Sequence, residues 1–248
     1  MRMKYFITIV FLVFSVVGYN QTATEIVKKM DANMRGKSSQ AVLTIKTVRP
    51  TWSREMVVKT WMKGTKYTMI LVQAPAKEKG IVFLKRDKEV WNWMPALERN
   101  IKLPPSMMAN SWMGTDFTND DLVKEASVID DYFHKIVGDT LIDKKQCYIV
   151  EFLPKPNTAV VWGKILVSID KVNFLELHSE FYDEEGKLVN SMNAKNISMM
   201  DGRLIPTHME MIPADKKNQK TELIYQSIQF NRNIEDNFFT TEKMKQLN

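Results

Sequence analysis

The chain has 248 residues, of which 44% are hydrophobic and 26% charged, with 9 Gly and 9 Pro. These values are typical of a folded globular protein and exclude collagen-like repeats, mucin-like stalks and extended disorder. The single cysteine, Cys147, excludes an intramolecular disulfide, so packing alone must hold the fold. The formal net charge of +6 is spread along the chain without a block of five basic residues, which argues against a nucleic-acid-binding protein.

The first residues have the pattern of an export signal. Arg2 and Lys4 precede an uncharged apolar run over residues 5–17. This run is short for a transmembrane helix, which needs about 20 apolar residues, and it is typical of a signal peptide. We therefore expect residues 1–20 to be a cleaved signal peptide and residues 21–248 to form a single domain exported to the periplasm. No cysteine lies near the cleavage region, so we expect no lipid anchor on the mature N-terminus.

An amphipathic helix and a long series of strands are predicted after the signal. Thr22 and Glu25 have the capping-box spacing of a helix start, and Gly36 marks the end of that helix. Over residues 40–94, and again over 134–230, apolar residues recur with period two, which predicts short antiparallel strands. The expected fold is mainly β (α+β): an open antiparallel half-barrel of about eleven strands, closed by the N-terminal helix and a helical lid segment.

The expected lid lies at about residues 104–131, where the β pattern is interrupted. This stretch begins at a proline pair, shows no alternation, and contains Asn119 as a candidate helix cap. It is rich in methionine and aromatic residues, which suit an ordinary core and equally suit a site for varied acyl chains, because methionine repacks around different shapes. We expect Gly114 to turn the chain so that Asp116 can hydrogen-bond local backbone donors.

The candidate ligand-binding residues are apolar side chains of the expected lid and of the concave face of the sheet. On the strands they alternate with polar or opposite-facing neighbours. The set is Met56, Val58, Met62, Trp91, Trp93, Met107, Met108, Trp112, Met113, Phe117, Leu175, Leu177 and Phe181.

Catalytic chemistry has little support in the sequence. The common motifs of nucleotide binding, serine hydrolysis and zinc proteolysis do not occur. Cys147 alternates with Ile149 on a predicted strand and is better explained as a small buried apolar residue than as a nucleophile. His134 has no partner nearby in the sequence and is given no role. We expect no enzyme activity and no cofactor.

One group of residues has the composition of a metal site. Glu176, His178 and Glu180 have strand spacing and should share one face, while His208 and Glu210 are paired in the same way on a later strand. The opposite face of the first strand is apolar. The trio is therefore better explained as the solvated side of an amphipathic strand, and we expect no metal.

The segment from Trp91 to Leu122 resembles the outer-membrane lipoprotein-sorting protein family, the LolA-like periplasmic carriers. It contains a W-x-W-x-P strand at Trp91, Trp93 and Pro95, followed by M-G-[ST]-D-F-[ST]-x-x-D-L starting at Met113. These motifs are typical of an uncharacterised branch of that family. Further likeness in FYDEEGKLV and in the C-terminal NIEDNFFT extends the resemblance over the whole mature chain.

The resemblance implies a half-barrel whose hydrophobic cavity binds the acyl chains of a lipoprotein or lipid and carries them toward the outer membrane. It also implies transient membrane contact, with an inner-membrane lipid exporter as donor and an outer-membrane acceptor. We expect a monomer. The alternative is a periplasmic sensor or interaction module on the same fold, which binds a lipoprotein or a partner protein without transporting it. An arginine helps to hold the lid shut in the better-known carriers, and the resemblance assigns no residue here to that place.

Overall fold

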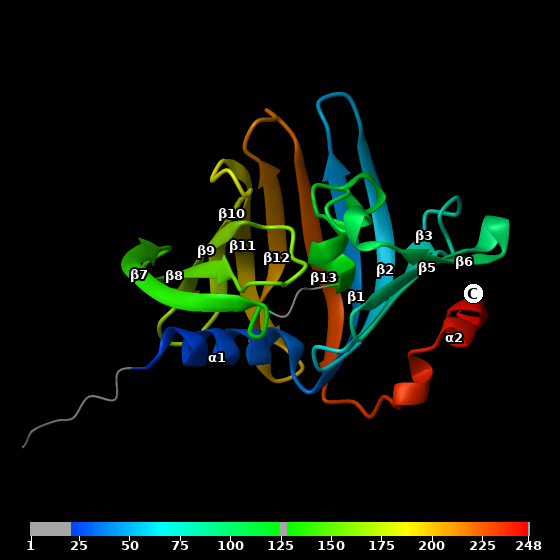
Figure 1. Cartoon of the computed structure of the whole chain (residues 1–248), viewed down its shortest axis with the longest axis horizontal. Coiled ribbons are helices and arrows are strands. Elements are labelled where there is room, and N and C mark those ends of the chain that lie inside the picture. Colours follow the sequence, from blue (N-terminus) through cyan, green and yellow to red (C-terminus); the bar gives the residue numbers. More distant parts are fainter. Residues whose placement is uncertain (1–20, 125–127, 248) are drawn as a thin grey trace, which may run out of the picture.

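The computed structural model describes residues 21–124 and 128–247, and the expected signal peptide lies outside them. These residues form one antiparallel sheet in the order β6-β5-β4-β3-β2-β1-β13-β12-β11-β10-β9-β8-β7, curved around a concave face (Figure 1). Among the described residues, no helix is long and apolar enough to cross a membrane. The strands are β1 (Ser38–Val48), β2 (Ser53–Lys63), β3 (Tyr67–Ala74), β4 (Val82–Arg86), β5 (Glu89–Met94), β6 (Arg99–Leu103), β7 (Tyr132–Ile142), β8 (Lys145–Pro154), β9 (Lys164–Asp170), β10 (Glu176–Tyr182), β11 (Leu188–Met200), β12 (Arg203–Pro213) and β13 (Lys220–Phe230).

The mainly β, open half-barrel predicted from the sequence is confirmed, but the sheet has 13 strands instead of about eleven. One strand that the alternation does not reveal is β6, with the sequence RNIKL. It lies at the edge of the sheet and is exposed or half-buried at every position. Because neither of its faces is buried deeply, its sequence carries no period-two signal.

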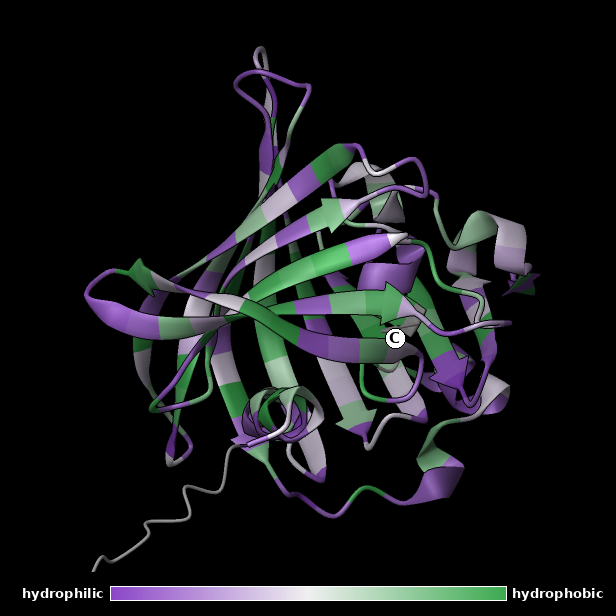
Figure 2. Ribbon diagram, turned by 60° about the vertical axis from the view of Figure 1, so that its left-hand side comes forward, coloured by the Kyte–Doolittle hydropathy of each residue, from purple (hydrophilic) through white to green (hydrophobic). Residues whose placement is uncertain are grey.

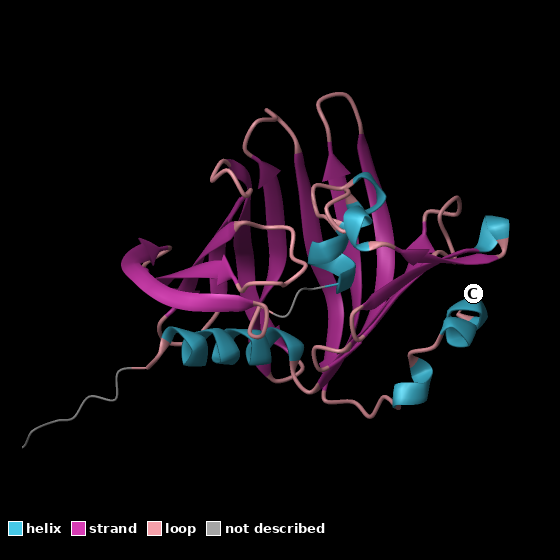
Figure 3. Ribbon diagram, viewed as in Figure 1, coloured by secondary structure: helices cyan, strands magenta, loops and turns pink. Residues whose placement is uncertain are grey.

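The order of the strands determines the path of the segment expected to be a lid. Strands β1 to β6 form one meander and β7 to β13 a second, and the two meet where β1 pairs with β13. Consequently β6 and β7, which follow each other in the chain, are the two opposite edges of the sheet. Their connection therefore crosses from one edge to the other, and we call its described parts, residues 104–124 and 128–131, the crossover segment. It contains short helical turns that lie in front of the sheet (Figure 3).

Helix α1 (Ala23–Arg35) packs beneath the curved sheet, where it contacts β7 and β12. Its predicted start is confirmed, because the Glu25 backbone N–H donates to Thr22 Oγ1 at 3.2 Å and the Glu25 carboxylate accepts from the Thr22 N–H at 2.9 Å. The buried side chains of Ile26, Val27 and Met30 join the main hydrophobic core. Figure 2 shows hydrophobic and hydrophilic residues alternating along the strands above this helix.

The outer face of strands β2 to β5 is covered by the C-terminal segment, which contains the helix α2 (Thr241–Gln246). Phe239 and Met244 are fully buried there, and the ring of Phe239 stacks on Tyr67 with 5.1 Å between centroids. We call this second core the outer-face cluster; its buried members are Trp61, Met69, Val82, Leu84, Trp93, Ile234, Phe239 and Met244.

The outer-face cluster explains why the placement of Trp91 and Trp93 differs from the expectation. Both side chains pack in this cluster, and it is their neighbour Val90 that joins the main core. A strand that is buried on both faces is apolar on both faces, so alternation cannot identify the face that lines the concave side.

Truncating Trp93 to alanine should therefore weaken the fold without affecting a ligand in the concave face. Trp93 is 8% exposed, and its indole nitrogen has no hydrogen-bond partner among the described residues. We expect the free energy of unfolding to fall by about 2–3 kcal/mol, somewhat less than for a fully buried tryptophan. Urea denaturation measures the loss, and unchanged binding of an acyl probe by the folded variant checks the placement. Weaker binding at unchanged stability would contradict it.

Candidate functional site

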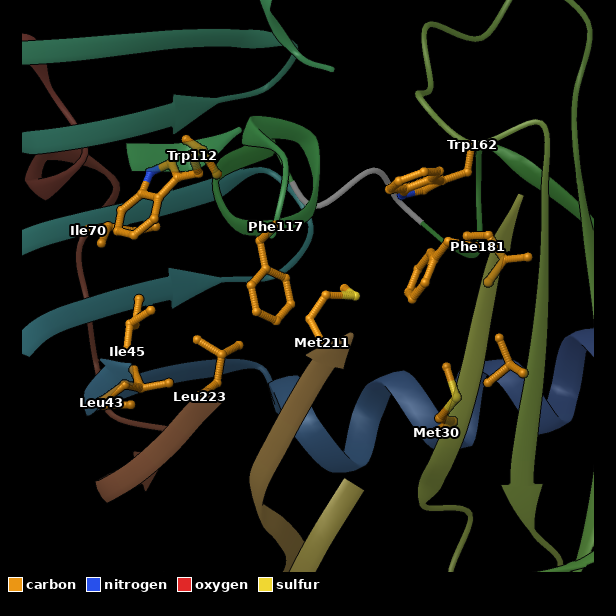
Figure 4. Packing of buried hydrophobic residues seen from close by; sticks show 14 of the residues in the cluster. Met30, Leu43, Ile45, Ile70, Trp112, Phe117, Trp162, Phe181, Met211 and Leu223 are labelled. Carbon is orange, nitrogen blue, oxygen red and sulfur yellow. The ribbon is translucent and has the colours of Figure 1, made fainter. Parts of the chain in front are cut away.

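The concave face encloses a cavity of about 300 Å³. This volume is at the lower end of the range of small-molecule sites, about 300–1,000 Å³. Side chains from α1, from both meanders of the sheet and from the crossover segment line the cavity together. In Figure 4, Trp112 and Phe117 project from the crossover segment toward the sheet. The apolar lining residues include Met30, Met34, Leu43, Ile45, Val58, Met62, Ile70, Trp112, Phe117, Phe152, Trp162, Ile165, Val167, Phe181, Met192, Met209, Met211 and Leu223.

The structure brings five of the candidate ligand-binding residues together around the cavity: Val58, Met62, Trp112, Phe117 and Phe181. They come from β2, from the crossover segment and from β10, which are distant in sequence. These residues are the part of the candidate set that lines the cavity.

The remaining candidates of β2 and the crossover segment lie around the cavity or at the surface. Met56 and Met108 are buried in the main core, and Met113 is partly buried against it. Met107 is 38% exposed to solvent. The methionines of the crossover segment thus divide between core and surface, and none of them lines the cavity.

Leu175 and Leu177 do not face the cavity, because a β-bulge interrupts β10. Glu176 pairs with Ile169 of β9 and His178 pairs with Ser168, so Leu177 is an extra residue between two paired positions. A bulge of this kind reverses the alternation of the residues that follow it.

The reversal separates residues that strict alternation would place on one face. Phe181 pairs with Ile165, a cavity-lining residue, and points inward, whereas Leu175 and Leu177 pack with Cys147 in a small buried cluster. Cys147 is fully buried, as expected. The expectation that Glu176 shares the solvated face of His178 and Glu180 is wrong, because Glu176 lines the cavity.

Several cavity residues were missed in the sequence. Strands β11 to β13 contribute Met192, Met209, Met211, Leu223 and Tyr225. Their alternation predicts strands correctly, but it does not show which face turns inward. Only the pairing of β1 with β13, which joins the two meanders, places this face opposite the crossover segment.

The crossover segment is fastened to the sheet through Asp116. Its carboxylate accepts two hydrogen bonds from Arg49, from Nη1 at 2.9 Å and Nη2 at 3.0 Å, and a third from Thr221 Oγ1 at 2.7 Å. Arg54 additionally donates to the backbone carbonyl of Met113. The expectation that Asp116 accepts local backbone hydrogen bonds is therefore wrong, because two side chains distant in sequence occupy its carboxylate.

The helical stretch Asp120–Lys124 begins with a reciprocal cap that involves Thr118 rather than Asn119. Thr118 Oγ1 accepts from the Asp121 N–H at 3.1 Å, and the Asp121 carboxylate accepts from the Thr118 N–H at 2.8 Å. Asn119 instead donates to the Met107 carbonyl at 2.9 Å. The Thr-x-x-Asp spacing, which approximates a capping box, was a signal in the sequence that could have identified Thr118.

Asp121 belongs to the cavity lining as well. Burial raises its pKa to about 6, against the opposing effect of hydrogen bonds from Thr118 and from Trp162, whose Nε1 donates to Oδ1 at 2.8 Å. Trp162 in turn packs on Phe181 with 5.2 Å between ring centroids. The cap of the crossover segment and the far wall of the cavity are thus directly connected.

On other strands, His208, Glu210 and Glu222 place their potential ligand atoms within 4.8 Å of one another. Lysine ammonium groups already occupy both carboxylates. Glu210 pairs with Lys195 at 2.5 Å and with Lys220 at 2.7 Å, and Lys220 also reaches Glu222 at 2.5 Å. The two carboxylates are therefore engaged in an ion-pair network with these lysines.

The network should make stability depend on pH through Glu210. Burial raises the pKa of its carboxyl, but the two lysines outweigh that effect and lower the pKa to about 2. Because the pKa of Glu210 is lowered on folding, its ionised carboxylate stabilises the fold at pH values above 4.5, the ordinary pKa of the group. This contribution is lost as the pH falls toward 2. At pH 7, Glu210→Gln should reduce the free energy of unfolding by about 2 kcal/mol.

Urea denaturation of wild type and variant over a pH series measures this contribution. The difference in the free energy of unfolding between wild type and Glu210→Gln should become smaller as the pH falls below 4.5. Glu55→Gln is the matched control, because the Glu55 side chain is 61% exposed in its pair with Lys46, and such a surface pair contributes about 0–1 kcal/mol. A Glu210→Gln effect that stays constant from pH 7 to pH 3 would contradict the assignment.

Comparison with solved structures identifies the architecture. A LolA superfamily protein from Nitrosomonas europaea matches with a TM-score of 0.80 and 24% identity over 90% of this chain and 100% of that chain. A protein described as an outer membrane lipoprotein-sorting protein domain, from Vibrio parahaemolyticus, matches with a TM-score of 0.80 and 20% identity over 90% and 98% of the two chains. A DUF1329 family protein from Desulfovibrio piger gives a TM-score of 0.81 and 20% identity over 90% and 97%.

These likenesses show that the chain shares its fold with a LolA superfamily protein and with a lipoprotein-sorting protein domain, in agreement with the fold that the resemblance in the sequence implied. No curated protein matches the chain in sequence. The profile of a family described as "Uncharacterized protein" matches residues 64–246, and the chain belongs to that family.

Proposed function

We propose that this protein is a carrier that binds the acyl chains of a lipoprotein or lipid in its cavity and moves them toward the outer membrane. The observation that carries the proposal is the cavity itself, which has apolar walls on both meanders and on the crossover segment. Its occurrence in a fold shared with a LolA superfamily protein and a lipoprotein-sorting protein domain supports this assignment. The basic and apolar pattern of residues 1–20 supports export to the periplasm, with residues 21–248 as the mature domain.

Burial of an acyl chain supplies enough free energy for transport through water. Each buried CH₂ group contributes about 0.8 kcal/mol, so a dozen carbons contribute on the order of 10 kcal/mol before the costs of association. No covalent step is required. Release requires an acceptor with a more favourable apolar environment, and an inner-membrane lipid exporter and an outer-membrane protein would serve as donor and acceptor during transient membrane contact.

Native purification followed by lipid extraction tests the proposal. The mature protein, isolated from the periplasm without detergent, should yield acyl chains in near-stoichiometric amounts by mass spectrometry. A sample of the same protein that has been delipidated with organic solvent and refolded is the control. Protein that contains no acyl chains and takes up none after refolding would contradict the carrier, and a co-purifying protein in their place would support a sensor or interaction module.

A further inference from the structure

The charged residues that line the cavity are mostly acidic, although the chain as a whole carries a net charge of +6. Asp31 and Arg35 of α1 form an ion pair at 3.1 Å, and Arg35 is the one basic residue of the lining among the described side chains. The other charged lining residues are Asp120, Asp121 and Glu176. Among the described residues, the lining contains no lysine or histidine. The interior therefore has the opposite sign of charge from the protein as a whole.

Glu176 is the acidic residue whose position is hardest to explain by the fold alone. It precedes the bulge at Leu177 and faces the cavity, whereas Glu180, which follows the bulge, does not line the cavity. Its carboxylate accepts a hydrogen bond from the Ser179 hydroxyl. Within residues 21–124 and 128–247, no lysine or arginine forms an ion pair with it.

Hydrogen bonds hold the turn that precedes Glu176. The preceding turn is closed by Asp170, whose carboxylate accepts from the backbone N–H groups of Val172 and Asn173, each at 3.2 Å. Asn33 of α1 donates to the Asn173 carbonyl at 2.7 Å. These hydrogen bonds fix the turn that leads into β10, and pairing with Ile169 of β9 fixes the backbone of Glu176 itself.

A carboxylate without a cation in an apolar cavity is costly to ionise. Burial raises the pKa of Glu176, while the Ser179 hydrogen bond and the His178 charge lower it only in part. A cationic group of a bound ligand would remove this cost. An anionic group would add repulsion from Glu176 and from Asp121.

We infer that the cavity selects amphiphiles whose polar end carries an ammonium group, with Glu176 as the partner of that group and the acyl chain against the apolar wall. The inference rests on the proposed function, because it specifies which acyl ligands the same cavity accepts. Nonspecific attraction to this basic protein would instead favour anionic amphiphiles such as dodecanoate. A preference for amines is therefore diagnostic of the cavity.

Displacement of N-phenyl-1-naphthylamine, a neutral fluorescent hydrophobic probe, tests the inference at pH 7.5. Dodecylamine should displace the probe at a concentration at least ten times lower than dodecanoate, with dodecanol between them. Propylamine, which has the ammonium group but no long chain, should not displace it. In Glu176→Gln the ratio between dodecylamine and dodecanoate should fall to threefold or less, and dodecanol should still displace the probe. Glu180→Gln is the matched control and should keep the wild-type ratio.

Equal displacement by dodecylamine and dodecanoate in the wild type would overturn the inference, as would an unchanged ratio in Glu176→Gln. Normal binding of dodecanol in those cases would leave the proposed function intact. If neither the probe nor dodecanol binds the wild type, the proposed function fails, and the inference fails with it. Dodecanol binding also shows that the Glu176→Gln variant is folded.

Discussion

Replacing Trp112 by alanine should reduce the free energy of unfolding by about 4–5 kcal/mol, the upper part of the range for large-to-small changes in a core. Trp112 is fully buried, and its ring packs on Phe83 with 5.4 Å between centroids. It also lines the cavity, so the change should enlarge the cavity and weaken the binding of an acyl probe. Urea denaturation followed by circular dichroism measures the loss of stability.

The stability of Trp112→Ala also shows whether the part of the crossover segment around Trp112 is packed in the core or acts as a mobile lid. Met107→Ala is the control within the segment, because Met107 is 38% exposed and lies outside the buried core, so its truncation should cost about 0.5–1 kcal/mol. A Trp112→Ala variant that loses less than 1 kcal/mol but binds the probe poorly would show that the segment opens readily and is not packed as the structure has it.

Asp116→Ala should reduce the free energy of unfolding by about 4 kcal/mol. The change removes the main partner of the Arg49 guanidinium, which then remains charged in a position with little access to water. The Asp116 and Arg49 side chains are 5% and 13% exposed, and their double hydrogen bond fastens the crossover segment to the residue that follows β1. Thermal or urea denaturation measures the effect. Loss of this contact should also make the cavity easier to enter, which would appear as faster uptake of an acyl probe.

A double variant separates the loss of the fastening from the cost of an unpaired charge. Arg49→Met combined with Asp116→Leu removes both charges and should recover a large part of the stability lost in Asp116→Ala, since a buried ion pair replaced by apolar groups is often nearly neutral. Stability equal to wild type in the single Asp116→Ala variant would contradict the role of this pair in holding the segment.

The local features of the fold could be predicted from the sequence, because they depend on neighbours in the chain. The capping box of Thr22 and Glu25 is an example, and so are the period-two strands. The face that each strand turns inward depends on pairing with distant segments. Trp91 and Trp93 illustrate this limit, because the C-terminal segment that covers them follows about 140 residues later in the chain.

The candidate site was predicted in part for the same reason. Phe181 lines the cavity, but the bulge at Leu177 leaves Leu175 and Leu177 on the other face, whereas Glu176 faces the cavity with Phe181. One additional residue in a strand reverses every later position, and no period-two pattern reports it. The Arg49 and Asp116 contact joins positions 67 residues apart, so it too required the folded structure.

Photocrosslinking tests the central claim most directly, namely that the concave cavity holds an acyl chain. A long-chain alcohol with a diazirine near its end should label peptides from β2, from the crossover segment and from β12, because Val58, Trp112 and Met211 line one cavity. Excess dodecanol should abolish this labelling. Labelling confined to the outer-face cluster around Trp93 and Met244, or labelling that dodecanol does not reduce, would contradict the claim.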